Sequence, residues 1–236
     1  MPALLALSVS TLASADTIYQ SEDPFGGFFG LWGADVFVGQ TVGQRFTPDA
    51  DYRLDQVRLW FMSNDFEGVV DEFVTVTIQT DAGGPDESYP SGVVLDQATF
   101  EASAIGWDPV EEVAAFDGVV LHAGRRYWVV CSSNAAGGED PVWNFASEGL
   151  GFNAFRLGND PWQPGGSGAE LTMGVDATPA PCIPDFVGDG TLDFFDVQAF
   201  LARFSAGSPS VDLNNDGHLN FFDVQAFLTA LSAGCP

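Results

Sequence analysis

The sequence predicts a mainly β protein, in which a jelly-roll-like antiparallel β-sandwich is followed by a small α-helical domain. Before residue 176, short runs rich in Val, Phe, Thr and Trp are separated by Gly, Asp, Asn and Pro, as in proteins built from many short strands. Further along, the octapeptide at residues 194–201 recurs unchanged 27 residues later, at residues 221–228. Each copy opens an amphipathic stretch, which predicts two equivalent helices.

The first 15 residues are expected to be a secretory signal. Residues 4–12 are mostly apolar, and Ala13-Ser14-Ala15 offers a small-residue cleavage site before Asp16. No basic residue precedes the apolar run, which leaves open whether this signal is complete. The run is too short to cross a bilayer, and no other stretch is long enough. We therefore expect a secreted or cell-surface protein without a transmembrane segment.

The composition argues against nucleic acid as a partner. The formal net charge is -26, and the seven basic residues are all arginine, too few to neutralise a run of phosphates. A hydrophobic content of 46% with 21 Phe argues against a disordered chain.

Nine segments have the composition of strands, and the loops between them carry strong turn signals. Val74, Val76 and Ile78 alternate with polar residues, which is the period of a half-buried strand. The predicted strands are Val42–Phe46, Arg53–Met62, Phe73–Thr80, Val93–Phe100, Val119–Leu121, Arg126–Ser132, Val142–Phe145, Phe152–Leu157 and Glu170–Asp176. We expect the sandwich to cover residues 16–176. Residues 177–181 contain two prolines and are expected to form an extended linker to a domain at residues 182–236.

The loop before the second octapeptide has the spacing of a calcium-binding loop. Oxygen-bearing side chains stand at loop positions 1, 3, 5, 9 and 12, glycine at position 6 permits a sharp turn, and position 7 offers its backbone carbonyl. The predicted Ca²⁺ ligands are, in order, Asp212, Asn214, Asp216, His218, Asn220 and Asp223. This loop is expected to hold the stronger of two sites.

The loop before the first octapeptide is a poorer copy. Its predicted ligands are Asp185, Asp189, Thr191, Asp193 and Asp196. Position 3 is Val187, which has no side-chain oxygen, so a weaker second Ca²⁺ site is expected here. The alternative is that both loops are acidic turns, but two such loops before identical helix starts favour calcium.

Each expected helix carries an apolar stripe with helical spacing. The two stripes are Val197, Phe200, Leu201 and Phe204, and Val224, Phe227, Leu228 and Leu231. They are expected to pack on each other. The aromatic pairs that open the helices, Phe194 and Phe195 with Phe221 and Phe222, are candidate contacts for a partner. The alternative is that these rings fold back on neighbouring loops.

A tandem loop-helix unit with Asp at position 12 resembles a type I dockerin. The bracketing Cys182 and the final Ala233-Gly234-Cys235-Pro236 are similar to the variant known as GC-type, a C-terminal anchor of secreted bacterial proteins. The resemblance implies calcium-dependent docking to a cohesin-like or other surface anchoring protein. Dockerins carry recognition residues at loop positions 10 and 11, often small and hydroxylated, where this chain has phenylalanine.

A second, looser resemblance covers about residues 37–175. It rests on residues 42–48, 52–59 and 121–130, which are similar to the choice-of-anchor sandwich domains of bacterial exported proteins. Its motifs are mostly strand patterning, so it implies the fold more than a function.

The three cysteines fit an oxidising compartment. A disulfide between Cys182 and Cys235 would join the ends of the helical domain and stabilise it by roughly 4 kcal/mol. Cys131 shares a face with Tyr127 and Val129 in a predicted strand, so a buried, inert thiol is expected.

The sequence contains no recognisable catalytic motif, so we expect a non-catalytic protein. It lacks a nucleophile elbow, a zinc-ligand spacing and a phosphate loop. Trp162, Trp107 and Trp32 lie in loops rich in Gly, Pro and Asp and are candidate ligand-binding residues for polysaccharide, although loop tryptophans also plug the ends of sandwiches. The preferred function is the anchoring of a sandwich to an extracellular assembly. The alternatives are a carbohydrate-binding component of polysaccharide degradation and a glycan-active hydrolase.

Overall fold

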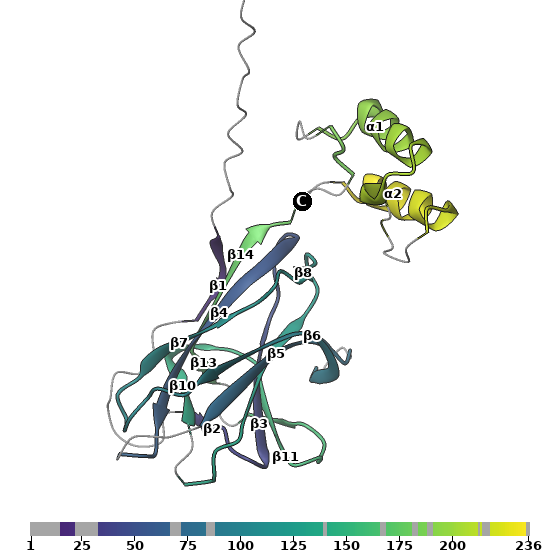
Figure 1. The fold of residues 1–236 in the computed structure, drawn as a ribbon. Helices are drawn as coiled ribbons and strands as arrows, with labels where there is room; N and C mark the ends of the chain where they lie inside the picture. The colour runs from purple at the N-terminus through teal and green to yellow at the C-terminus, as the bar shows by residue number, and fades with distance from the viewer. Residues whose placement is uncertain are drawn as a thin grey trace, which may run out of the picture. The chain divides into compact units, whose positions relative to one another are not determined.

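The computed structural model describes residues 15–21, 33–66, 72–83, 88–138, 141–165, 169–180, 184–187, 191–211, 213 and 218–234, with only the backbone at 148–150, 169 and 209. The chain divides into two compact units, Met1–Pro179 and Ala180–Pro236. We call them the sandwich unit and the helical unit, and describe each by itself (Figure 1). The predicted signal falls almost wholly outside the described residues, and Asp16, which follows it, begins the first strand.

The sandwich unit is mainly β, with two antiparallel sheets, as predicted. One sheet has the order β1-β14-β4-β10-β13, with β2 paired to β10 and with β7 and β8 paired to β4; the other has the order β12-β11-β3-β9-β5-β6. The strands are β1 (Asp16–Gln20), β2 (Gly33–Asp35), β3 (Gln40–Phe46), β4 (Tyr52–Ser63), β5 (Phe73–Asp81), β6 (Pro90–Glu101), β7 (Val110–Ala115), β8 (Val120–Leu121), β9 (Tyr127–Ser133), β10 (Pro141–Leu150), β11 (Asn153–Leu157), β12 (Gln163–Pro164), β13 (Ala169–Leu171) and β14 (Met173–Pro179). Each of the nine predicted segments overlaps an observed strand, and the last is divided at Thr172.

The inner faces of both sheets contribute to one apolar core, which is consistent with a β-sandwich. Val74, Val76 and Ile78 on β5 are fully buried, as their alternation predicts, because every second side chain points to the same face of a strand. Trp143 is also fully buried and donates its indole N–H to the Thr172 carbonyl at 2.8 Å. The finer expectation of a jelly roll stays a prediction.

The predicted linker begins too early. Residues 177–179 belong to β14, where Ala177 pairs with Leu54 and Pro179 pairs with Tyr52 on β4. Ala177 is fully buried, so the strand continues for as long as its alternate side chains can enter the core. Pro179 is tolerated because it ends the strand, where its missing N–H costs little.

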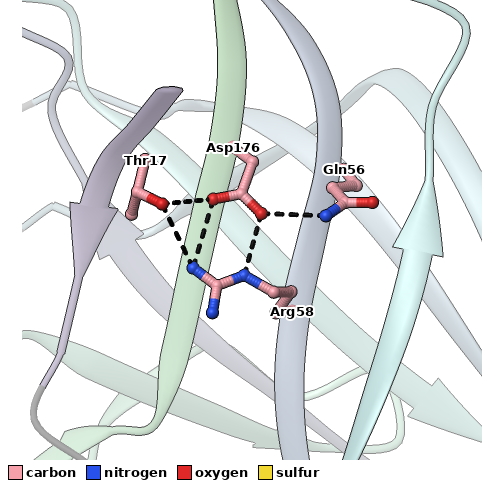
Figure 2. Close-up of polar contacts among 4 residues, drawn as sticks. All are labelled: Thr17, Gln56, Arg58 and Asp176. Carbon is pink, nitrogen blue, oxygen red and sulfur yellow. Dashed lines mark hydrogen bonds and ion pairs between the residues drawn. The ribbon is translucent and has the colours of Figure 1, made fainter. Parts of the chain in front are cut away.

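A charged network ties the edge of the larger sheet to its centre. Arg58 on β4 donates from Nε and from one terminal nitrogen to the two oxygens of Asp176 on β14, at 2.8 and 3.1 Å. Thr17 on β1 and Gln56 on β4 donate to the same carboxylate at 2.6 and 2.9 Å (Figure 2). Burial raises the pKa of the Asp176 carboxyl, but the hydrogen bonds from Arg58, Gln56 and Thr17 outweigh it and hold this pKa below its ordinary value.

Asp176→Asn is expected to lower the free energy of unfolding of the sandwich unit by about 1–3 kcal/mol at neutral pH, because Arg58 loses its partner. A depressed carboxyl pKa adds stability above the unfolded pKa of about 4 and loses it as pH falls through the folded pKa, so the deficit of the variant should shrink in acid. Urea unfolding followed by tryptophan fluorescence at neutral and acidic pH measures both. Asp160→Asn, at an exposed turn, is the control. A deficit that does not change with pH would contradict this account.

The helical unit contains two helices, α1 (Phe194–Ser205) and α2 (Phe221–Ala233), with a single turn of 3₁₀ helix, η2 (Pro209–Val211), between them. Phe200 and its duplicate Phe227 are buried and stack face to face, with ring centroids 4.1 Å apart and planes inclined by 3°. Val211 completes the buried centre, and seven partly buried side chains surround it: Phe186, Val197, Phe204, Leu213, Leu219, Val224 and Leu231.

The predicted stripes are too wide. Leu201 and Leu228 are 51% and 52% exposed, so only three members of each stripe reach the small core. The two helices meet at one pair of rings, so each helix buries only a narrow part of its surface. No described residue of the unit covers the side of the helix on which Leu201 or Leu228 lies. No helix among the described residues is long and apolar enough to cross a membrane.

Candidate calcium loops and docking face

The last residue of each predicted calcium loop is a fully buried carboxylate. Asp196 and Asp223 both lie in the first turn of their helix and have no exposed surface. Asp196 accepts backbone N–H groups of Asp193 and Val187, both at 3.0 Å. Asp223 accepts those of Asn220 and Leu213, at 2.8 and 2.9 Å. Each carboxylate therefore ties the start of its loop to the start of its helix.

These hydrogen bonds keep the first of the two carboxyls ionised. The backbone N–H groups of Asp193 and Val187 lower the pKa of Asp196 below its ordinary value, against a smaller opposing effect of burial. A buried carboxylate in its charged form is the kind of group that a hard cation such as Ca²⁺ prefers.

The residues at loop position 9 are helix caps. The Asp193 carboxylate accepts the Phe195 N–H at 2.7 Å, and the Asn220 side-chain oxygen accepts the Phe222 N–H at 2.8 Å. With the aspartates three residues later, they form a reciprocal capping box at each helix. This role was not predicted from the sequence, although an Asp or Asn followed three residues later by an acidic residue could have indicated it.

Part of the predicted ligand set lies outside the described residues. This is true of Asp189, Asp212, Asn214 and Asp216. The His218 carbonyl, which was expected to face the ion, accepts a hydrogen bond from the Asn220 side-chain amide at 3.1 Å. Among the described residues, no three His, Cys, Asp or Glu side chains lie close enough together to hold a metal ion.

Both helices begin with an exposed aromatic pair. Phe194 and Phe195 are 73% and 61% exposed, and their duplicates Phe221 and Phe222 are 72% and 62% exposed. The alternative that these rings fold back on neighbouring loops is therefore wrong. With Leu201 and Leu228, they form what we call the two docking patches, one on each repeat, each containing two Phe and one Leu.

The residues beside the two patches are not all the same. A shallow, open groove of about 460 Å³ runs beside α1, lined by Val187, Phe195, Gln198, Ala199 and Ala202. Three of these residues, Phe195, Gln198 and Ala199, are identical in the second repeat, whereas Ala202 corresponds to Thr229 and Val187 to Asn214. The residue that removes a ligand from the first loop thus adds apolar surface beside the first patch.

The three candidate tryptophans are in different situations. Trp107 is exposed and packs edge-on against Phe66, with ring centroids 5.3 Å apart. Trp162 is half-buried, and the Arg156 guanidinium covers its ring at 5.0 Å from the centroid. Trp32 lies outside the described residues. The structure does not bring Trp107 and Trp162 together.

The remaining candidates have simple environments. Cys131 is fully buried, and burial raises the pKa of its thiol, as expected for an inert cysteine. His122 is exposed, with Nδ1 3.2 Å from Asp51. Cys182 and Cys235, the predicted disulfide, lie outside the described residues.

Comparison of the chain with protein-family models and with curated proteins finds no match.

Proposed function

We propose that the helical unit is a calcium-dependent, dockerin-like docking module that attaches the sandwich unit to an extracellular assembly. The observation that carries this proposal is the duplication of the docking patch. Equivalent residues of the two repeats have nearly the same exposed fractions, 73% and 72% at the first Phe and 61% and 62% at the second. Exposing four aromatic rings on so small a unit is unfavourable in water, and such surfaces are typical of binding sites.

Calcium would hold the loops that present the patches. The loops carry the donor type that a hard cation prefers, with Asp185, Asp193 and Asp196 in the first loop and Asp223 at position 12 of the second, although the described side chains do not converge on one point. The aromatic pairs directly follow loop position 9, so any ordering of the loop also orders the first turn of the helix and its rings. We expect the second loop to bind calcium more tightly than the first, because its sequence contains more of the expected ligands.

The partner is expected to be a cohesin-like or other surface protein with an apolar socket. A socket for phenylalanine pairs differs from one for small hydroxylated residues, so the partner would be a divergent one. In this proposal the sandwich unit is non-catalytic cargo, and the protein is secreted or displayed at the cell surface.

The test is binding of the labelled full chain to intact cells of the organism that produces it, in millimolar calcium. Replacing Phe194, Phe195, Phe221 and Phe222 by Ser should weaken binding at least about tenfold, because aromatic residues in a desolvated contact commonly contribute 2 kcal/mol or more. Serine is compatible with a helix start, so the helical signal in circular dichroism should survive.

The matched control removes an exposed aromatic pair from the other unit. Phe66→Ser with Trp107→Ser should leave attachment unchanged. Equal losses in the two variants would indicate nonspecific adhesion and contradict the docking role, as would attachment that persists unchanged in chelator.

A further inference from the structure

The outer face of the six-stranded sheet carries three of the seven arginines of the chain. On β3 and β9, residues alternate between the core and the opposite face: Val42 and Val129 enter the core, and Arg45 and Trp128 lie opposite each other on the outer side. Arg126 directly precedes β9 and is close enough to Arg45 to affect its pKa, and Arg156 comes from β11, which pairs with β3. We call this surface the arginine face.

The arginine face has an apolar floor with aromatic edges. Trp128, Val130 and Ala154 form a second buried cluster, separate from the main core, and Tyr89, Phe152 and Trp162 pack around it partly exposed. Gly43 belongs to this floor, because a Cβ there would lie 3.3 Å from both the Trp128 ring and Val130. The apolar cluster beneath the arginines is thus closely packed, and partly exposed aromatic rings surround it.

Two of the arginines are held in place by those rings. The Arg45 guanidinium lies 4.6 Å from the centroid of Phe152, and that of Arg156 lies 5.0 Å from the centroid of Trp162. Arg156 is opposite Thr41, four residues from Arg45 along β3, which separates the two positions by about 13 Å along the strand. Stacked guanidinium groups lose little conformational entropy when they bind an anion.

Neighbouring charges have opposing effects on the pKa of Arg45. Burial lowers the pKa of Arg45 and the neighbouring Arg126 lowers it further, while Asp81 opposes both. The Asp81 carboxylate is already engaged, because it accepts hydrogen bonds from Trp128 Nε1 at 3.0 Å, from Gly83 N at 2.8 Å and from the Ser88 hydroxyl. Within the described part of the chain, Arg156 Nε is buried without a hydrogen-bond partner.

We propose that the arginine face binds a polysaccharide segment that carries uronate carboxylates. The partly exposed aromatic rings offer apolar contact surface for sugar rings, and Arg45 and Arg156 offer two separated donors that suit carboxylates. Double-stranded nucleic acid fits less well, because its phosphates are more closely spaced than the carboxylates of a polyuronate and a protein with net charge -26 therefore repels it more strongly at long range. This proposal goes beyond the docking role and does not depend on it.

The experiment titrates the full chain with an oligogalacturonate and with a neutral cello-oligosaccharide of equal length, by calorimetry in the presence of EDTA. EDTA prevents calcium from bridging the carboxylates of the ligand and those of the protein. It also removes any calcium-dependent binding by the helical unit, so the result tests the arginine face independently of the docking proposal. We expect binding of the oligogalacturonate alone. Arg45→Gln and Arg156→Gln should each raise its dissociation constant by about tenfold or more.

The control has the same change in net charge elsewhere on the sandwich unit. Arg53→Gln and Arg125→Gln, each made alone at an exposed arginine, should change the dissociation constant less than about twofold. Because Arg156 comes from a different strand, about 13 Å from Arg45 along the strand direction, Arg156→Gln carries the test if Arg45→Gln fails to fold. The proposal is overturned by no binding of the oligogalacturonate, by equal binding of the neutral oligosaccharide, by equal losses in the control, or by tighter binding of dextran sulfate.

Discussion

Chelation of calcium from the full chain is expected to unfold the helical unit and to leave the sandwich unit folded. Among the described residues of the helical unit, three apolar side chains are fully buried, a core too small to stabilise a unit of this size without additional support. An ion that binds only the folded state adds about 2.7 kcal/mol of stability at a free concentration of 100 times its dissociation constant. Removing the ion removes this contribution, while the sandwich unit has an extensive core of its own.

Two spectroscopic signals separate the units. All six tryptophans precede residue 180, so tryptophan fluorescence reports on the sandwich unit alone. Both α-helices of the described residues lie in the helical unit, so the helical signal in circular dichroism reports on that unit. EDTA should abolish the helical signal, excess calcium should restore it, and magnesium should restore it poorly because it demands a stricter geometry. A helical signal that persists unchanged in EDTA would show that calcium does not stabilise the helical unit.

Phe227→Ala is expected to unfold the helical unit even in the presence of calcium. Phe227 and Phe200 stack at the centre of the unit, and both are buried. Truncation of a buried Phe commonly costs about 3–5 kcal/mol, as much as the total stability of many small domains. Calcium titration of the variant, followed by circular dichroism, should therefore show a large rise in the calcium concentration needed to form helix, or no helix.

The matched control is the next residue on the same helix. Leu228 is 52% exposed, so Leu228→Ala should change stability by no more than about 0.5 kcal/mol. The equivalent pair in the first repeat, Phe200→Ala and Leu201→Ala, should behave in the same way. If the Phe→Ala and Leu→Ala variants of one helix lose equal stability, the stacked phenylalanines are not the core of this unit in solution.

Much of the fold could be predicted from the sequence because its main strands are long and regularly patterned. The four strands that were missed, β1, β2, β7 and β12, are short or lie at the edges of sheets, where composition is under weaker constraint. The start of the linker was placed too early, at residue 177, because a proline-containing segment has the same composition whether it forms a linker or the end of a buried strand. The width of the helical stripes was overestimated because periodicity shows which face is apolar, but not how much of it a partner helix covers.

The candidate sites were predictable to different degrees. The predicted calcium loops and the aromatic pairs are contiguous in the sequence, so spacing alone could single them out, but calcium binding stays a prediction, and spacing did not show that Asp193 and Asn220 cap the helices. The arginine face could not be predicted. Arg45, Arg126 and Arg156 are distant in the sequence, and only the pairing of β3 with β9 and β11 brings them onto one surface.

The stack of Phe200 on Phe227 also bears on how this tail is assembled. A residue that meets its own duplicate forms the kind of contact found at the two-fold axis of a homodimer, where one surface is complementary to itself. A peptide with a single loop and helix would bury its ring only by pairing with a second such peptide. Joining both halves in one chain makes that association intramolecular, at the high effective concentration set by a short connection, so the tail folds at any dilution.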